Sequence, residues 1–244
     1  MDLGIEQMSK GKIDSLTIGV LGGAGTRATV YMFKQYADVF EAKKEWDRPR
    51  LIIDNRCTMP SRVRAVLYGE KREQLIDEMT ESLEALHKNG CNQLLIGCNT
   101  AHVFLPDVIE RKPELQNCIV SIIEEAAKAV SSSTTTREVG VLASEGTIES
   151  GIYQKVFLKY GLSCNAPSRK EYGYIRDCIE AVKCNQINEE VVDAFKQLIS
   201  KYPICVLGCT ELPILWDTCS DELGGIQVID PVRVAFENIK AQWG

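Results

Sequence analysis

The sequence predicts a mainly parallel α/β fold built from two similar halves. Short β-branched and apolar runs alternate with stretches whose apolar residues recur at helical spacing, which is typical of strands connected by helices in a parallel sheet. A polar break, SSSTTT at residues 131–136, interrupts the pattern, and the pattern then begins again. Two segments of the first half also recur in the second half, which favours an internal duplication.

The first half begins with the strand TIGVLGG, which glycines terminate. It continues with a helix over RATVYMFKQYADVFEA, a strand at RLIID, a second helix and the strand NQLLIG. The predicted elements are strands at 17–23, 50–54 and 92–97 and helices at 27–42 and 72–89.

The segment between the halves predicts a strand at 117–122, a helix near 124–130 and an exposed loop at 131–136. REVGVLASEGT then starts the second half. Its predicted helices cover 148–160, 170–183 and 188–201, its later strands cover 204–208 and 226–230, and a final helix ends the chain.

The duplication rests on two matches in the same order. IGVLGGAGT matches VGVLASEGT with an offset of 140 − 19 = 121, and LIGC matches VLGC with an offset of 209 − 98 = 111. Any two α/β halves share junctions between strands and glycines, so either match alone has a simple structural explanation. Two matches with a cysteine in register, Cys98 and Cys209, favour a duplication.

Composition excludes several classes of function. The chain has 244 residues, 45% of them hydrophobic and 25% charged, and a net charge of −6 that favours neither nucleic acid nor an anionic membrane. No apolar run reaches the roughly 20 residues that span a bilayer, and the polar N-terminus has no secretory core. We therefore expect a cytoplasmic protein whose ten cysteines are reduced. Without a CxxC pair and with two histidines, no metal site is expected.

The matched cysteines lie where ligands bind in parallel α/β sheets, beyond the carboxyl ends of strands. Asn99, Thr100 and Thr210 follow them directly. Helices that begin there favour anions, including a thiolate, through their dipoles and free N–H groups. One cysteine alone suits acyl transfer or decarboxylation. With one cysteine on each side of a carbon, a thiolate can take a proton from one face while the other thiol gives a proton to the opposite face, so the pair favours racemisation or epimerisation.

Four motifs carry a resemblance to a known family. CNTAH, GCTELP, GVLGGAGTRAT and GTIESGIYQ resemble the signatures of the aspartate/glutamate racemase superfamily, and the likeness runs from Ile18 to Asp230. The resemblance implies a cofactor-independent amino-acid racemase with two pseudo-symmetric three-layer α/β domains and an active site in the cleft between them. The implied domains are residues 1–116 plus 213–244, and residues 117–212. The family commonly dimerises, so a homodimer is expected.

The resemblance also implies roles for individual residues. Cys98 and Cys209 fall on the proton-transfer positions, and MPSR and AVKCN place Arg62 and Lys183 on cationic positions that suit a dicarboxylate. The expected substrate-binding residues are Gly23, Arg62, Asn99, Thr100, Thr147, Lys183 and Thr210, and the accessory residues are Asn55, His102 and Glu211.

The substrate is left open between two acids. Thr-Glu after Cys209 resembles aspartate racemases, whereas glutamate racemases usually have Thr-His. DNRCTMPSR departs from the aspartate racemase pattern, and the glycine expected after Lys183 is absent. Aspartate is the leading candidate, followed by glutamate or a broader range.

Alternative interpretations remain. A hydantoin racemase or maleate isomerase-like reaction would use the same fold, and a non-catalytic protein would bind a small acid without turnover. No lysine stands out for a Schiff base with pyridoxal phosphate, and a cysteine pair needs no cofactor. Cys57 borders the proposed substrate segment. The other cysteines, Cys91, Cys118, Cys164, Cys178, Cys184, Cys205 and Cys219, are expected in the core.

Overall fold

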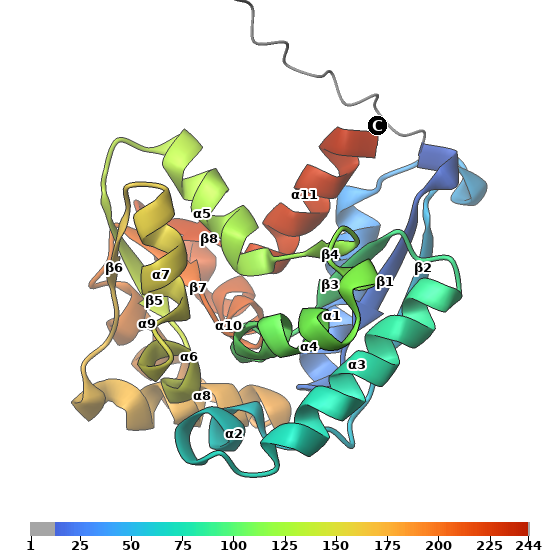
Figure 1. The fold of residues 1–244 in the computed structure, drawn as a ribbon. Coiled ribbons are helices and arrows are strands. Elements are labelled where there is room, and N and C mark those ends of the chain that lie inside the picture. Colours follow the sequence, from blue (N-terminus) through green and yellow to red (C-terminus); the bar gives the residue numbers. More distant parts are fainter. Residues whose placement is uncertain (1–12, 244) are drawn as a thin grey trace, which may run out of the picture.

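The structure, a computed structural model, describes residues 13–243 and contains two four-stranded parallel sheets that lie on opposite sides of the molecule, with helices between them (Figure 1). The first has the order β2-β1-β3-β4, and the second has the order β6-β5-β7-β8. The strands are β1 (Thr17–Leu21), β2 (Arg50–Asp54), β3 (Gln93–Ile96), β4 (Ile119–Val120), β5 (Glu138–Leu142), β6 (Ser163–Asn165), β7 (Ile204–Leu207) and β8 (Gln227–Ile229). The polar N-terminal segment, in which we expect no secretory core, lies almost entirely outside the described residues.

The two sheets repeat the same pairing. Gly19 of β1 lies opposite Leu94 of β3, and Gly140 of β5 lies opposite Cys205 of β7. The first strands differ by 140 − 19 = 121 and the third strands by 205 − 94 = 111, which are the two offsets found in the sequence. Each sheet is therefore one copy of the same α/β unit.

Helices connect the parallel strands, because a parallel pair needs a crossover. The first half has α1 (Thr26–Val39), α2 (Arg62–Tyr68), α3 (Arg72–Lys88) and α4 (Leu105–Arg111), with a 3-10 helix, η3 (Thr100–Phe104), before α4. Then follow α5 (Ile122–Ser133), α6 (Glu145–Glu149), α7 (Ile152–Lys159), α8 (Tyr172–Lys183), α9 (Glu189–Ile199), α10 (Leu212–Cys219) and α11 (Pro231–Trp243).

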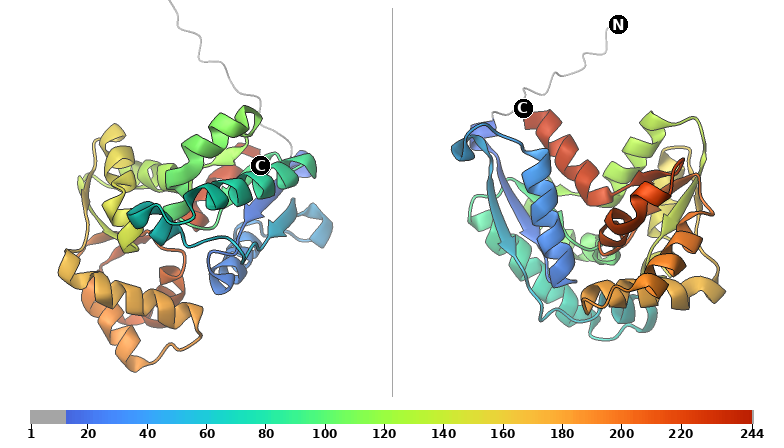
Figure 2. Two further views of the ribbon diagram at one scale, coloured as in Figure 1. Left: turned by 60° about the horizontal axis from the view of Figure 1, so that its bottom comes forward. Right: turned by 180° about the vertical axis from the view of Figure 1, so that it is seen from behind.

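The two central strands of each sheet are buried on both faces, as the three-layer α/β architecture requires. Leu95 of β3 and Val206 of β7 belong to one central core that also contains residues of α1, α5, α7 and α11. Their neighbours Ile96 and Leu207 point the other way, toward α3 and α4 in the first half and toward α8, α9 and α10 in the second. Figure 2 shows these helices around the two sheets.

The predicted domain limits stay a prediction, and strand pairing near them is as follows. β4, predicted in the second domain, pairs with β3 of the first sheet, and β8, predicted in the first domain, pairs with β7 of the second. Helix α10 also packs against α8 and α9. Helix α11 packs on α1 of the first half, and Lys240 Nζ donates to the carbonyl of Val39 (2.6 Å).

Some local expectations were wrong. Residues 131–133 end α5 rather than forming a loop, and the helix predicted over 148–160 is divided at Gly151, whose φ of 66° breaks it. Helices α2, α4 and α10 were not predicted. Cys184 is exposed rather than in the core, and Cys118 and Cys164 are half-buried.

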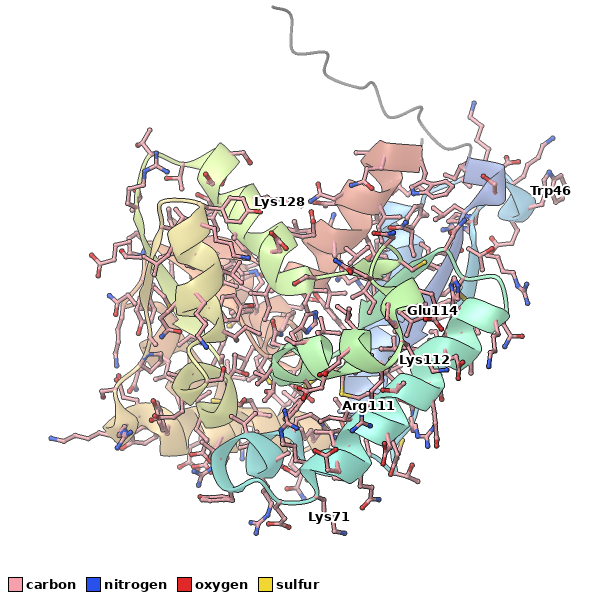
Figure 3. The ribbon with its side chains drawn as sticks, in the orientation of Figure 1. Trp46, Lys71, Arg111, Lys112, Glu114 and Lys128 are labelled. Carbon is pink, nitrogen blue, oxygen red and sulfur yellow. The ribbon has the colours of Figure 1, made fainter. Side chains whose placement is uncertain are left out.

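Charged side chains on the surface hold α4 against α3. Arg111 donates to Glu73 (2.6 Å), and Lys112, directly after α4, donates to Glu84 of α3 (2.6 Å); Figure 3 labels both cations. These contacts support the segment that carries Thr100. No helix in the described part of the chain is long and apolar enough to cross a membrane.

Candidate active site

Cys98 and Cys209 occupy equivalent positions in the two halves. Each follows the last residue of the third strand of its sheet by two positions, with a buried glycine between. A Cβ on Gly97 would lie 2.6 Å from Met32 Sδ, and one on Gly208 would lie 2.9 Å from Ala143 Cβ, so a larger residue at either turn would displace its neighbours. The two thiols therefore lie at the carboxyl ends of the strands, where parallel sheets bind ligands.

Both cysteines line one cavity of about 70 Å³, which we call the inner cavity. Its walls come from both halves of the molecule. Its lining residues are Ala24, Ser61, Arg62, Val63, Cys98, Asn99, Thr100, Ser144, Ile179, Lys183, Gly208, Cys209, Thr210 and Glu211. The structure thus brings together eight of the twelve residues expected at the site, and Gly23, Asn55, His102 and Thr147 are the other four.

Hydrogen bonds cross between the halves beside the thiols. Thr210 Oγ1 donates to the carbonyl of Gly97 (3.2 Å), and the Tyr153 hydroxyl donates to Asn99 Oδ1 (2.7 Å). Thr100 Oγ1 lies 2.7 Å from Thr147 Oγ1. All of these hydrogen-bonding side chains are buried, so the bonds fix the position of one strand end relative to the other.

The two thiols have different surroundings. Cys209 Sγ donates to Glu211 Oε2 (3.0 Å), and burial together with the charge of Glu211 raises the pKa of the Cys209 thiol well above its usual value. At the offset of 111, Thr100 stands where the second half has Glu211. Within residues 13–243 Cys98 Sγ has no hydrogen-bond partner. The two thiols therefore occupy equivalent positions but differ in their hydrogen bonds, because Glu211 accepts one from Cys209 and the described residues offer no such partner to Cys98.

A glycine makes room for the Glu211 carboxylate. A Cβ on Gly25 would lie 2.1 Å from Glu211 Oε1, closer than any non-bonded contact allows. The side chain of Glu211 is almost fully buried, with 3% of the residue exposed. The early glycine segment thus shapes the second-half side of the site.

Two cations border the inner cavity. Arg62 donates to the carbonyls of Ala24 (2.8 Å) and Pro60 (3.1 Å), its Nε is buried without a partner, and no carboxylate of the described chain pairs with it. Lys183 donates to Glu180 (2.9 Å). Burial lowers the pKa of Lys183, but the hydrogen bond to Glu180 and the charge of Glu211 outweigh it, so the pKa is raised. Both side chains can attract an acidic ligand.

Hydrogen-bond donors also face the inner cavity. Asn99 Nδ2 is buried and has no partner in the described structure, although an unpaired buried donor costs about 1–3 kcal/mol. Thr100, Ser144 and Thr147 form a hydroxyl cluster with distances of 2.7 to 3.1 Å. A ligand carboxylate in the cavity would satisfy Asn99 Nδ2 and lie beside the hydroxyls of Thr100 and Ser144.

The four predicted residues outside the cavity have supporting positions. His102 Nδ1 donates to the carbonyl of Cys98 (2.9 Å) rather than contacting its sulfur, and burial lowers the pKa of His102 to about 4, so the ring is neutral near pH 7. Gly23 has φ of 83°, and a Cβ there would lie 2.3 Å from the backbone of Arg56. Thr147 lies behind Thr100, and the exposed Asn55 donates to Thr26 (3.3 Å).

Sequence reasoning missed several residues that shape the site. Ser144 is the counterpart of Gly23 at the offset of 121, so the repeat itself could have indicated it. Tyr153 lies within the motif GTIESGIYQ, but its bond to Asn99 joins residues 54 positions apart and has no local signal. Val63 and Ile179 form apolar walls from elements of opposite halves.

Fold and site together define a class of two-lobed α/β proteins in which each lobe contributes one cysteine to a shared cavity. The chain belongs to the Asp/Glu/hydantoin racemase family, a family of isomerases, because the family model matches residues 21–239.

Solved structures with this fold include an aspartate racemase of Picrophilus torridus, with 21% identity, a TM-score of 0.79 and 93% of each chain covered. A glutamate racemase of Francisella tularensis in complex with D-glutamate has 19% identity and a TM-score of 0.62, with 93% of this chain and 80% of that chain covered.

Curated relatives point to the same family. The glutamate racemase of Aquifex aeolicus is 26% identical over 177 residues, which are 72% of this chain and 68% of that protein. The glutamate racemase of Oceanobacillus iheyensis is 28% identical over 64% of this chain and 58% of that protein. The chain therefore spans about three-fifths to two-thirds of the length of these relatives.

Proposed function

We propose that the protein racemises an acidic amino acid, aspartate or glutamate, by transferring protons between Cα and the thiols of Cys98 and Cys209. The observation that carries this proposal is that one thiol from each half lines the same cavity. Such a pair can approach a bound carbon from opposite faces, and that arrangement inverts its configuration.

The surroundings of the thiols suggest their starting roles. Cys209 donates its proton to Glu211, so we assign it the acid role in the resting enzyme, and Cys98 the base role. The Cys98 thiolate takes the Cα proton and becomes a thiol, while the carbanion takes the Cys209 proton and leaves a thiolate there. The opposite enantiomer is converted by the reverse transfer. The scheme uses no cofactor and no metal.

Polar groups around the inner cavity suit an amino dicarboxylate. Asn99 Nδ2 and the hydroxyl of Thr100 are donors for the α-carboxylate, and their fixed positions reduce the cost of orienting the substrate. Arg62, which has no carboxylate partner in residues 13–243, and Lys183 supply positive charge for an acidic side chain. Aspartate remains the first candidate because Thr-Glu follows Cys209, and glutamate is the second.

Chiral chromatography tests the proposal directly. Purified protein without added pyridoxal phosphate is incubated separately with each enantiomer of aspartate and of glutamate. We expect at least one acid to approach an equal mixture from both directions. If neither acid changes configuration, the proposal is wrong. A homodimer and a cytoplasmic location stay predictions, and light scattering on the purified chain tests the first.

A further inference from the structure

A second cavity adjoins the inner one. It has a volume of about 210 Å³, and we call it the outer cavity. The two cavities share the lining residues Ser61, Val63, Ser144, Ile179 and Lys183, so they lie side by side. The inner cavity alone is much smaller than the roughly 300–1,000 Å³ of ordinary ligand sites, so the outer cavity offers room for the part of a longer ligand that does not fit between the thiols.

One face of α8 forms a wall of this space. Arg176, Ile179, Glu180 and Lys183 line the outer cavity at positions i, i+3, i+4 and i+7, which lie on one side of a helix. Lys183 also lines the inner cavity, whereas Arg176 lines the outer cavity alone. Seven residues of helix separate their Cα atoms by about 10 Å. A cation therefore stands at each end of the stripe.

Arg176 has hydrogen-bonding capacity to spare. Its Nη2 donates to Glu145 Oε2 (2.6 Å), and this is its one hydrogen bond in the described structure, although a guanidinium has five donors. Arg64, the other arginine of the outer cavity, bonds Glu70 through Nε (2.6 Å) and lies over the ring of Tyr68 (5.7 Å). Of the two, Arg176 is the freer to receive another carboxylate.

We propose that the outer cavity receives the substrate side chain and that Arg176 binds its distal carboxylate. Arg176 is then a specificity-determining residue that extends the substrate range beyond aspartate to acidic amino acids with longer side chains, namely glutamate and 2-aminoadipate. The inference rests on the proposed racemase function. The distal carboxylate would accept hydrogen bonds from the donors of Arg176 that Glu145 does not use. Two of these donors can bind both of its oxygens.

Substrate comparison with Arg176 variants tests this inference. Values of kcat/KM are measured for aspartate, glutamate and 2-aminoadipate with the wild-type protein, Arg176→Gln, Arg176→Lys and Arg169→Gln. Arg169 is the matched control, because it also pairs with a glutamate, Glu149 (3.0 Å), but is 81% exposed and lines neither cavity.

We expect Arg176→Gln to lower kcat/KM for glutamate and 2-aminoadipate relative to aspartate by about ten- to a hundredfold, mainly through KM. Arg176→Lys should recover part of the ratio of kcat/KM for the longer acids to that for aspartate, because lysine keeps the positive charge but lacks the paired N–H donors of the guanidinium. Arg169→Gln should leave the ratio at the wild-type value.

The possible failures are distinguishable. If the ratio of long to short acids does not change in Arg176→Gln, or if Arg169→Gln changes it equally, Arg176 does not bind the distal carboxylate. In that case aspartate turnover still supports the racemase function. If the wild-type protein converts none of the three acids, the proposed function is wrong, and the assignment of Arg176 is wrong with it.

Discussion

Thr210 and Gly97 are joined by a hydrogen bond, Oγ1 to carbonyl oxygen at 3.2 Å, that connects the two repeats beside both proposed catalytic cysteines. Gly97 directly precedes Cys98 and Thr210 directly follows Cys209. Tyr153 and Asn99 make a second bond between the halves (2.7 Å). The relative position of the thiols is therefore set by short polar contacts at the strand ends as well as by packing of helices.

Replacing Thr210 by Val tests the importance of this bond. The substitution removes the hydroxyl and leaves the buried carbonyl of Gly97 without its partner. We expect the free energy of unfolding to fall by about 1–2 kcal/mol and racemisation to slow about tenfold. Urea unfolding and chiral assays measure both, with Thr210→Ser as the control that keeps the hydroxyl. Equal behaviour of the Val and Ser variants would argue against a positioning role.

Glu211→Gln should make Cys209 more reactive toward alkylation. The carboxylate opposes formation of a negative thiolate beside it and, after burial, is the largest cause of the raised pKa of Cys209. Loss of the charge lowers that pKa, so iodoacetamide should modify Cys209 at a lower pH in the variant. Mass spectrometry of the Cys209 peptide across a pH series measures the shift. Unchanged or slower modification contradicts the assignment.

Gly25→Ala should disturb the site without touching a reactive group. The added Cβ would meet Glu211 Oε1 at 2.1 Å and displace the carboxylate from Cys209. We expect a loss of about 1–3 kcal/mol of stability and a lower kcat. Gly173→Ala is the control, because no atom lies within 4 Å of its added Cβ and alanine suits the first turn of α8, where Gly173 lies. Similar results for the two variants would show that the Gly25 contact is unimportant.

His102 predicts a pH dependence of stability. Burial lowers its pKa in the folded protein to about 4, below the ordinary value of 6.5. The stability that neutral His102 contributes is therefore fully present above about pH 6.5 and is lost as the pH falls toward 4. In this range the unfolded chain binds a proton at His102 and the folded chain does not. When the pH is lowered from 7 to 5, the free energy of unfolding of the wild-type protein, measured with urea, should fall by about 2 kcal/mol more than that of His102→Gln. Equal losses of unfolding free energy in the two proteins would contradict this prediction.

The repeat allowed much of the fold to be predicted. The offsets of 121 and 111, read from IGVLGGAGT and LIGC, are the offsets that superpose the strand pairing of the two sheets. Because the strand pairing is the same in both halves, the position of Cys98 relative to its sheet fixes that of Cys209. The pair of thiols at equivalent strand ends is thus a consequence of local patterns that recur.

Contacts between distant residues could not be predicted in this way. The need for Gly25 arises from Glu211, which is 186 residues away in sequence (211 − 25), and the bond of Tyr153 to Asn99 crosses between the halves. β4 is only two residues long, and no local pattern in the sequence indicates that it pairs with β3. The helix α2 was missed because MPSR and the residues after it have little apolar periodicity, yet its first residues form a wall of both cavities.

Incorporation of solvent deuterium at Cα tests the two-thiol mechanism most directly. Each enantiomer of aspartate and glutamate is incubated in D2O with the wild-type protein, Cys98→Ala, Cys209→Ala and the control Cys184→Ala, whose exposed thiol lines neither cavity. We predict deuterated product of inverted configuration from the wild-type and control proteins, and a loss of inversion of roughly 10²–10⁴-fold in either of the other variants. Inversion at the wild-type rate without Cys98 or without Cys209 would contradict the mechanism.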